Sequence, residues 1–115
     1  MKIHLEEYIR ENGSNPYQTW FNTLSTQAAV KITVAKARLE LGNTSNIKWF
    51  RGIGEYKIDW GPGYRIYLAK DGDTMIILFG GSTKKDQQKA IDQAIALHEE
   101  FQYRKKALTR KAKKP

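Results

Sequence analysis

The sequence predicts an α+β protein in which helices pack against an antiparallel sheet. Three observations predict it: a short alternating segment at the start, helical periodicity in the next segment and again near the end, and several apolar runs between glycine-containing turns. Helices and strands that are segregated along a chain are typical of this class, because each element must bury its apolar side against another. A length of 115 residues favours one domain with one core.

The first strand is expected at about residues 2–10, where apolar and polar residues alternate. The first helix should begin at Asn15, because Asn15 can cap a helix whose first position is Pro16 and whose capping-box partner is Gln18. We expect its inward side chains to be Trp20, Phe21 and Leu24.

The second helix should follow Ser25 and end at Gly42, because glycine accepts the left-handed conformation that closes many helices. Small and apolar residues recur within it at the spacing of one helical face. These residues are Ala28, Ile32, Ala35 and Leu39. The two helices are therefore expected to form a hairpin.

Four strands are expected next, near residues 46–50, 55–60, 64–70 and 74–80, as an antiparallel meander. Asp71 and Gly72 predict a two-residue hairpin turn, because both tolerate positive φ. A closing helix should run from about Lys84 to Tyr103, capped by Ser82 or Thr83. With all helices against one face of the sheet, the other face would stay open.

The open face is the first candidate site. Alternate residues of a strand point to opposite faces, so the apolar residues at positions 56, 58, 60, 64, 66 and 68 would meet the helices. The opposite set would then converge on the open face. It consists of Lys57, Asp59, Arg65 and Tyr67. Two cations beside an aromatic ring suit an RNA strand, because phosphates bind cations and bases stack on rings. The alternative is a solvated face with ordinary cross-strand ion pairs.

The segment from Gly80 to Lys85 is the second candidate. It follows a central strand and precedes a helix, so exposed backbone amides and the helix dipole would favour an anion there. The spacing of a P-loop is absent. A plain strand-to-helix turn is the alternative.

Charge is distributed unevenly along the chain. The net charge is +8, but residues 104–115 hold seven of the 20 basic residues and no acid, so residues 1–103 are nearly neutral. We therefore divide the chain into a domain at 1–103 and a basic tail at 104–115, which is either solvated or in contact with a polyanion. There is no cysteine and no cluster of metal ligands, and no apolar run is long enough to span a membrane. A cytoplasmic protein without metal or cofactor is expected. Of the two histidines, His98 is better interpreted as a boundary residue than as a base.

Two blocks of sequence resemble a known family. The first runs from Glu55 to Tyr67 and contains Gly-Pro-Gly-Tyr-Arg at 61–65. The second is Gly80-Gly81 followed by Lys84 and Gln87. Together, at this separation, they are similar to the RelE/ParE superfamily of toxins from type II toxin–antitoxin systems, in its HigB-like "addiction module killer protein" branch. The resemblance extends from Trp20 to about Glu100 and excludes the tail.

The resemblance implies a RelE-like microbial ribonuclease-type fold and a ribosome-dependent messenger RNA endoribonuclease without metal or cofactor. In such toxins the ribose 2′-hydroxyl attacks the adjacent phosphate. Arg65 would stabilise the charge that develops on phosphorus, and Lys57 would act as base if partial desolvation lowered its pKa. Lys84 would contact phosphate. The remaining substrate-binding candidates are Tyr67 (stacking or orienting), Lys85, Gln87 and Asp59. Relatives in the RelE branch have a second lysine where Asp59 stands here.

The resemblance also implies a partner, a cognate antitoxin that is a small helix-turn-helix protein and forms a hetero-oligomer with the toxin. Two other functions stay open. The chain could resemble the ParE branch and inhibit DNA gyrase without cutting RNA, or it could be a non-enzymatic module that binds nucleic acid through the tail alone.

Overall fold

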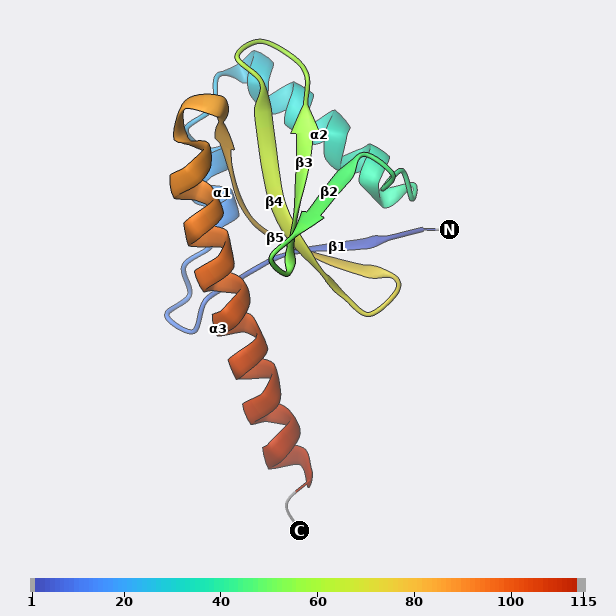
Figure 1. The fold of residues 1–115 in the computed structure, drawn as a ribbon, viewed down its shortest axis with the longest axis vertical. Helices are drawn as coiled ribbons and strands as arrows, with labels where there is room; N and C mark the ends of the chain where they lie inside the picture. Colours follow the sequence, from blue (N-terminus) through green and yellow to red (C-terminus); the bar gives the residue numbers. More distant parts are fainter. Residues whose placement is uncertain (1, 114–115) are drawn as a thin grey trace.

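The fold is α+β, as the sequence predicts (Figure 1). The structure is a computed structural model that describes residues 2–113, with side chains described as far as Arg110. Its elements in chain order are β1 (His4–Glu7), α1 (Pro16–Phe21), α2 (Thr26–Glu40), β2 (Ile47–Phe50), β3 (Ile53–Ile58), β4 (Tyr64–Asp71), β5 (Met75–Thr83), a short 3-10 turn η1 (Lys84–Asp86) and α3 (Gln87–Lys113). No helix in the described part of the chain is long and apolar enough to cross a membrane.

The five strands form one sheet in the order β1-β5-β4-β3-β2. Strands β2 to β5 form the antiparallel meander that the sequence predicts. Strand β1 lies at the far edge and pairs parallel to β5, with His4 opposite Met75. The first and last strands of the chain are therefore neighbours, a pairing that the sequence pattern did not predict.

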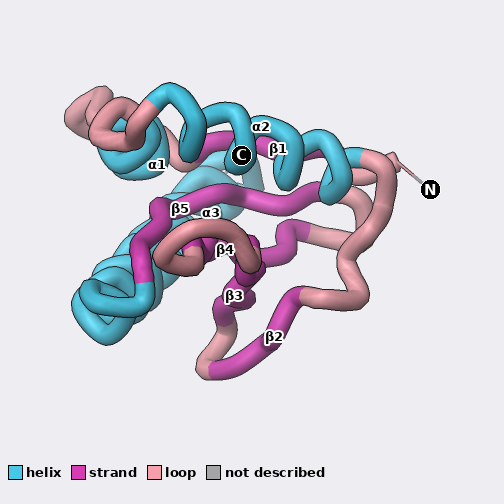
Figure 2. The backbone as a smooth tube through the Cα atoms, turned by 90° about the horizontal axis from the view of Figure 1, so that it is seen from above, coloured by secondary structure: helices cyan, strands magenta, loops and turns pink. Residues whose placement is uncertain are grey.

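Both faces of the sheet are covered, so the expectation of an open face is wrong. Helices α1 and α2 pack on one face, where Ile32 and Leu39 meet Ile66 and Leu68. Helix α3 packs on the other, where Ile91 and other residues cover a second apolar cluster. Figure 2 shows α1 and α2 along one side of the sheet and α3 on the other. The predicted alternation of side chains within β3 and β4 is confirmed, but the face that carries Arg65 and Tyr67 lies under α3.

Helices α1 and α2 begin where their capping residues predict. The Asn15 side chain accepts a hydrogen bond from the backbone N–H of Gln18 at 3.0 Å, and Ser25 caps α2 in the same way at Ala28. The Gln18 side chain donates to Asn22 and not back to the cap, so no capping box forms. The four residues of α2 that were predicted to face the core of the protein are the buried residues of this helix.

The two-residue hairpin turn lies at a different place from the one predicted. Asp71 is still part of β4 and pairs with Met75, so a three-residue turn follows it. The turn between β2 and β3 is the one with positive φ at both central residues, 52° at Arg51 and 84° at Gly52. The sequence indicated a turn at Gly52 but not its two-residue form, because arginine is rare at positive φ.

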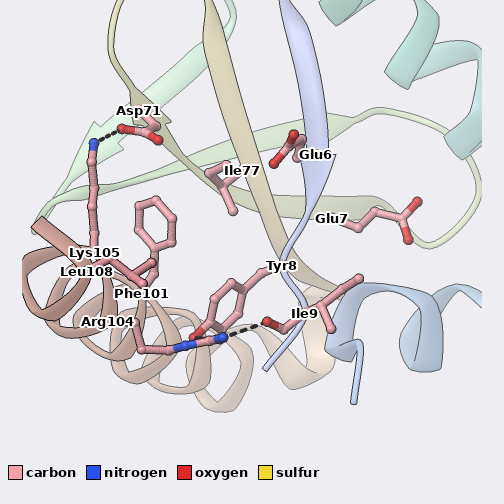
Figure 3. A pocket seen from close by; sticks show the side chains of 10 residues that line it. All are labelled: Glu6, Glu7, Tyr8, Ile9, Asp71, Ile77, Phe101, Arg104, Lys105 and Leu108. Atoms are coloured by element: carbon pink, nitrogen blue, oxygen red, sulfur yellow. Dashed lines mark hydrogen bonds and ion pairs between the residues drawn. The ribbon is translucent and has the colours of Figure 1, made fainter. Parts of the chain in front are cut away.

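The closing helix continues well beyond Tyr103, through the segment predicted to be a separate basic tail. Its first tail residues contact the body of the protein (Figure 3). Arg104 donates to the backbone oxygen of Ile9 at 2.8 Å and to the hydroxyl of Tyr8 at 3.1 Å, and Lys105 forms an ion pair with Asp71 at the end of β4. The start of the tail is therefore a docked helical segment.

Candidate functional site

Three strand ends bring the predicted cations to one end of the sheet. Strand β3 ends, β4 begins and β5 ends there, so Lys57 lies opposite Arg65 and Arg65 lies opposite Ser82. Lys84 and Gln87 follow directly as β5 gives way to η1 and α3. Residues that are far apart in the sequence thus share one small region.

A buried polar cluster lies at the centre of this region, and we define it as Glu55, Arg65, Tyr67, Ser82 and Gln87. The hydroxyl of Tyr67 donates to Glu55 Oε2 at 3.0 Å and lies 3.1 Å from Ser82 Oγ. Gln87 Nε2 donates to the same Glu55 oxygen at 2.8 Å. Because buried polar groups are costly unless they are paired, these bonds hold the Glu55 carboxylate in one position.

Arg65 is the least satisfied member of the polar cluster. Its side chain is 7% exposed, and its Nε lies 3.8 Å from Glu55 Oε2, too far for a good hydrogen bond. Nη1 makes a long contact of 3.4 Å with the backbone oxygen of Gly63. Nε is buried and has no hydrogen-bond partner among the described residues. A buried charged donor without a partner is costly, so an anion that reached it would be bound favourably.

Tyr67 has no exposed surface. The expectation that its ring stacks on a base is therefore wrong in this structure, because α3 covers the face. Burial raises the pKa of Tyr67 to about 12, and the nearby Glu55 carboxylate adds to this effect while Ser82 opposes it. The hydroxyl thus stays protonated and donates to Glu55, which fits the orienting role.

The other predicted site residues are exposed around the polar cluster. Lys57, Lys84 and Lys85 are accessible to solvent, and so is Asp59 in the loop after β3. Lys57 lies directly opposite Arg65, an arrangement of two like charges that is unfavourable in an isolated sheet. An anion between them would relieve this repulsion. The exposure of Lys57 also means that the desolvation expected for a lysine base is absent in the free protein.

The double glycine does not form the expected anion-binding turn. Gly80 and Gly81 lie within β5 and pair with Tyr67 and Ile66. Thr83 precedes η1 without a side-chain cap, and the Ser82 hydroxyl faces Tyr67, so neither predicted cap is used. A Cβ atom added at Gly80 would meet nothing within 4 Å, so there is free space beside the polar cluster on the face that carries Ser82.

The sequence interpretation missed two members of the polar cluster, Glu55 and Ser82. Glu55 alternates with Lys57 and Asp59, and a charged residue in such a pattern is usually solvated. The pattern gave no sign that α3 would cover this part of β3. Ser82 was interpreted as a helix cap because it stands just before the predicted helix.

The remaining titratable groups of interest lie elsewhere. His98 is part of α3, its ring lies 5.8 Å from that of Phe79, and burial lowers its pKa below 6.5. This environment fits the boundary role predicted for it. Within the described residues, no group of three or more His, Cys, Asp or Glu side chains could hold a metal ion.

Comparison with known proteins places the chain in a family. The fold and the site define an α+β protein with a buried acid–arginine pair at one end of its sheet. The chain is 38% identical over 87 residues to an uncharacterized protein of Haemophilus influenzae, covering 74% of this chain and 88% of that protein. It belongs to the same family as this protein. No family model matches the chain, and no solved structure matches it significantly.

Proposed function

We propose that the chain is the toxin of a type II toxin–antitoxin system, an endoribonuclease of the RelE/ParE superfamily that cuts messenger RNA on the ribosome and is silenced by a small helix-turn-helix antitoxin. The observation that carries the proposal is the buried Arg65, whose Nε lacks a partner while Lys57 stands opposite it and Lys84 nearby. Such a set of donors suits a phosphate, whose oxygens can accept from more than one cation at once.

The chemistry follows from these positions. The 2′-oxygen of a ribose attacks the adjacent phosphorus, the bond from phosphorus to the 5′-oxygen breaks, and the products are a cyclic phosphate and a free 5′-hydroxyl. Arg65 stabilises the negative charge that grows on the phosphate oxygens, and Lys84 holds the phosphate. Lys57, neutral once the bound RNA removes it from water, takes the 2′-proton, and the departing 5′-oxygen takes a proton from water. No metal or cofactor takes part in these steps.

Glu55, Tyr67 and Gln87 have a supporting part in this proposal. The Glu55 carboxylate lies beside the Arg65 guanidinium, and its position is fixed by hydrogen bonds from Tyr67 and Gln87. Groups of this kind orient a guanidinium without touching the RNA. Asp59 and Lys85, exposed at the same end of the sheet, would contact flanking nucleotides.

The test uses purified protein and translating ribosomes, with cleavage mapped by primer extension. Lys57→Ala and Lys84→Ala should each reduce cleavage by about a hundredfold while the melting temperature stays near that of the wild type, since both side chains are exposed. Arg38→Ala, an exposed cation on α2, is the matched control and should cleave normally. Intact messenger with wild-type protein would contradict the proposal, and a block of DNA supercoiling in the same preparation would favour gyrase inhibition instead.

A further inference from the structure

The ion pair between Lys105 and Asp71 separates two hollows along the second half of α3. Both hollows are lined by Asp71, Phe101 and Lys105. Figure 3 shows the first of them, which has an apolar floor that includes Ile77 and Phe101. The second, with a volume of about 550 Å³, lies between α3 and the end of β4 and is lined by Lys106 and Arg110. We call it the basic groove.

The cations of α3 in this region divide into two kinds. Arg104 and Lys105 are occupied by the body of the protein, through Tyr8, Ile9 and Asp71. Lys106 and Arg110 are exposed, and the structure gives them no ion pair among the described residues. They stand four residues apart, so they lie on the same side of the helix one turn from each other. The docked residues therefore hold the helix in place while two cations face the groove.

Asp71 is the only acidic residue among the described residues that line the basic groove, and Lys105 neutralises it. The groove therefore presents uncompensated positive charge. A preference of cations for the end of a helix explains Arg110 in part, because α3 ends at Lys113. It does not explain why like charges at 106 and 110 are placed together, an arrangement that weakens an isolated helix.

The uncompensated positive charge of the groove favours a nucleic-acid backbone over a protein segment. Protein partners usually bury an apolar anchor at the centre of the contact. Of the two large exposed apolar residues of α3, Leu108 lines the other hollow and Tyr103 lines neither hollow. Gln102 and Thr109 line the basic groove beside the two cations, and contacts of this kind suit phosphate and sugar oxygens.

We propose that the basic groove binds the phosphate backbone of single-stranded RNA, without regard to sequence and separately from the polar cluster that contains Arg65. Lys106 and Arg110 are the binding cations, and the docked contacts of Arg104 and Lys105 position them. The proposal does not depend on cleavage, because a bound strand would be held here whether or not another part of it is cut.

The test measures the affinity of the full chain for a fluorescent 2′-O-methyl oligoribonucleotide, which cannot be cleaved through a 2′-hydroxyl, by anisotropy over a series of salt concentrations. Lys106→Gln/Arg110→Gln should weaken binding by about tenfold at low salt, and the slope of log affinity against log salt should fall by about 1.4, roughly 0.7 for each lost phosphate contact. The matched control, Arg38→Gln/Lys48→Gln, removes two exposed cations elsewhere and should bind normally.

Four outcomes would overturn the proposal: equal binding by the wild type and the Lys106/Arg110 variant, an equal loss in the control, a large fall in the melting temperature of the Lys106/Arg110 variant, or tighter binding of a polyglutamate peptide than of RNA. The last outcome would assign the groove to an acidic protein segment. Lys57→Ala distinguishes the two proposals, because it should lose cleavage of messenger, while adding Lys106→Gln/Arg110→Gln to it should still weaken binding of the 2′-O-methyl strand by about tenfold. Wild-type protein that binds the strand through the groove but cuts no messenger would contradict the proposed function alone.

Discussion

Gly81 lies directly against the indole ring of Trp20. A Cβ atom added at Gly81 would stand 2.4 Å from ring atoms of Trp20, closer than real contacts allow, whereas one added at the neighbouring Gly80 would meet nothing within 4 Å. The two neighbouring glycines therefore differ in what a side chain would meet at each position. Gly81 permits α1 to pack on β5, and Gly80 leaves space beside the polar cluster.

Gly81→Ala should lower the free energy of unfolding by about 1–3 kcal/mol, because Trp20 must move to admit the methyl group. Gly80→Ala is the matched control and should change it by less than about 0.5 kcal/mol. Urea unfolding followed by circular dichroism measures both. Equal stabilities for the two variants would show that Trp20 relaxes freely.

Tyr67→Phe should lower the free energy of unfolding by about 1–3 kcal/mol near neutral pH, because Ser82 loses its partner and Glu55 loses one of its two hydrogen-bond donors. The effect should shrink at high pH. The pKa of Tyr67 is raised from 10.0 to about 12 in the folded state, so its contribution is fully present below pH 10 and is lost as the pH rises toward 12. Unfolding of both proteins between pH 7 and about pH 11.5 checks this. Burial also raises the pKa of Tyr17, but Tyr17 is present in both proteins, so its contribution cancels in the comparison. A difference that does not shrink would contradict the assigned pKa.

Arg65→Ala should abolish cleavage and also lower stability by about 3–5 kcal/mol, because it leaves the carboxylate of Glu55 buried without its opposite charge. On the open face that the sequence predicted for Arg65, the same substitution would cost little stability. Arg65→Lys should keep more of the stability but restore little cleavage, because a lysine cannot present two donors in a planar fork. Thermal melts and primer extension on the same samples separate the two effects. Near-normal cleavage by folded Arg65→Lys would show that positive charge alone is enough.

A chain that ends at Tyr103 should melt at a lower temperature than a chain that ends at Arg110. The shorter chain loses the contacts of Arg104 with Tyr8 and Ile9 and the ion pair of Lys105 with Asp71. The Lys105 side chain is more than half exposed, so the expected loss is modest, and it should decrease at high salt where the ion pair is screened. Equal melting temperatures would support the interpretation of residues 104–115 as an independent tail.

Stability should fall as the pH drops below about 6.5, and His98 should account for part of this fall. Burial lowers the pKa of His98 below its ordinary value of 6.5. At a pH between the pKa of the folded state and that of the unfolded state, the unfolded chain therefore binds a proton that the folded chain does not. That difference favours unfolding as the pH falls. His98→Phe should therefore flatten the dependence of the melting temperature on pH in this range. The opposite result, a steeper dependence, would mean that protonated His98 is stabilised by a partner.

Local sequence patterns predicted the helices and strands well, but they did not predict what packs against each of them. The four inward residues of α2 and the alternation within β3 and β4 followed from periodicity alone, because these spacings are fixed by backbone geometry. The position of α3 did not follow, since the alternation in β4 does not reveal whether the face that carries Arg65 is covered. One feature of the sequence contained this information: β5 has apolar residues on both faces, and both of its faces are buried.

The same limit applies to the candidate site. Sequence blocks brought Arg65, Lys57, Lys84 and Gln87 to attention, and the structure places them at one end of the sheet. The hydrogen bonds that join β3 to α3 through Glu55 depend on tertiary contacts 32 residues apart in the chain. No local rule of spacing could have predicted them.

The pairing of β1 with β5 has a consequence for synthesis of the chain. Tyr8 bonds Glu100 across 92 residues of sequence, and β1 can find its place only beside Met75 to Leu78. Contacts between distant parts of a chain slow folding, because the entropy of the intervening loop is lost before the contacts form. A nascent chain therefore cannot complete this fold until Glu100 has left the ribosome, so β1 and α3 join the sheet only after the meander has been made.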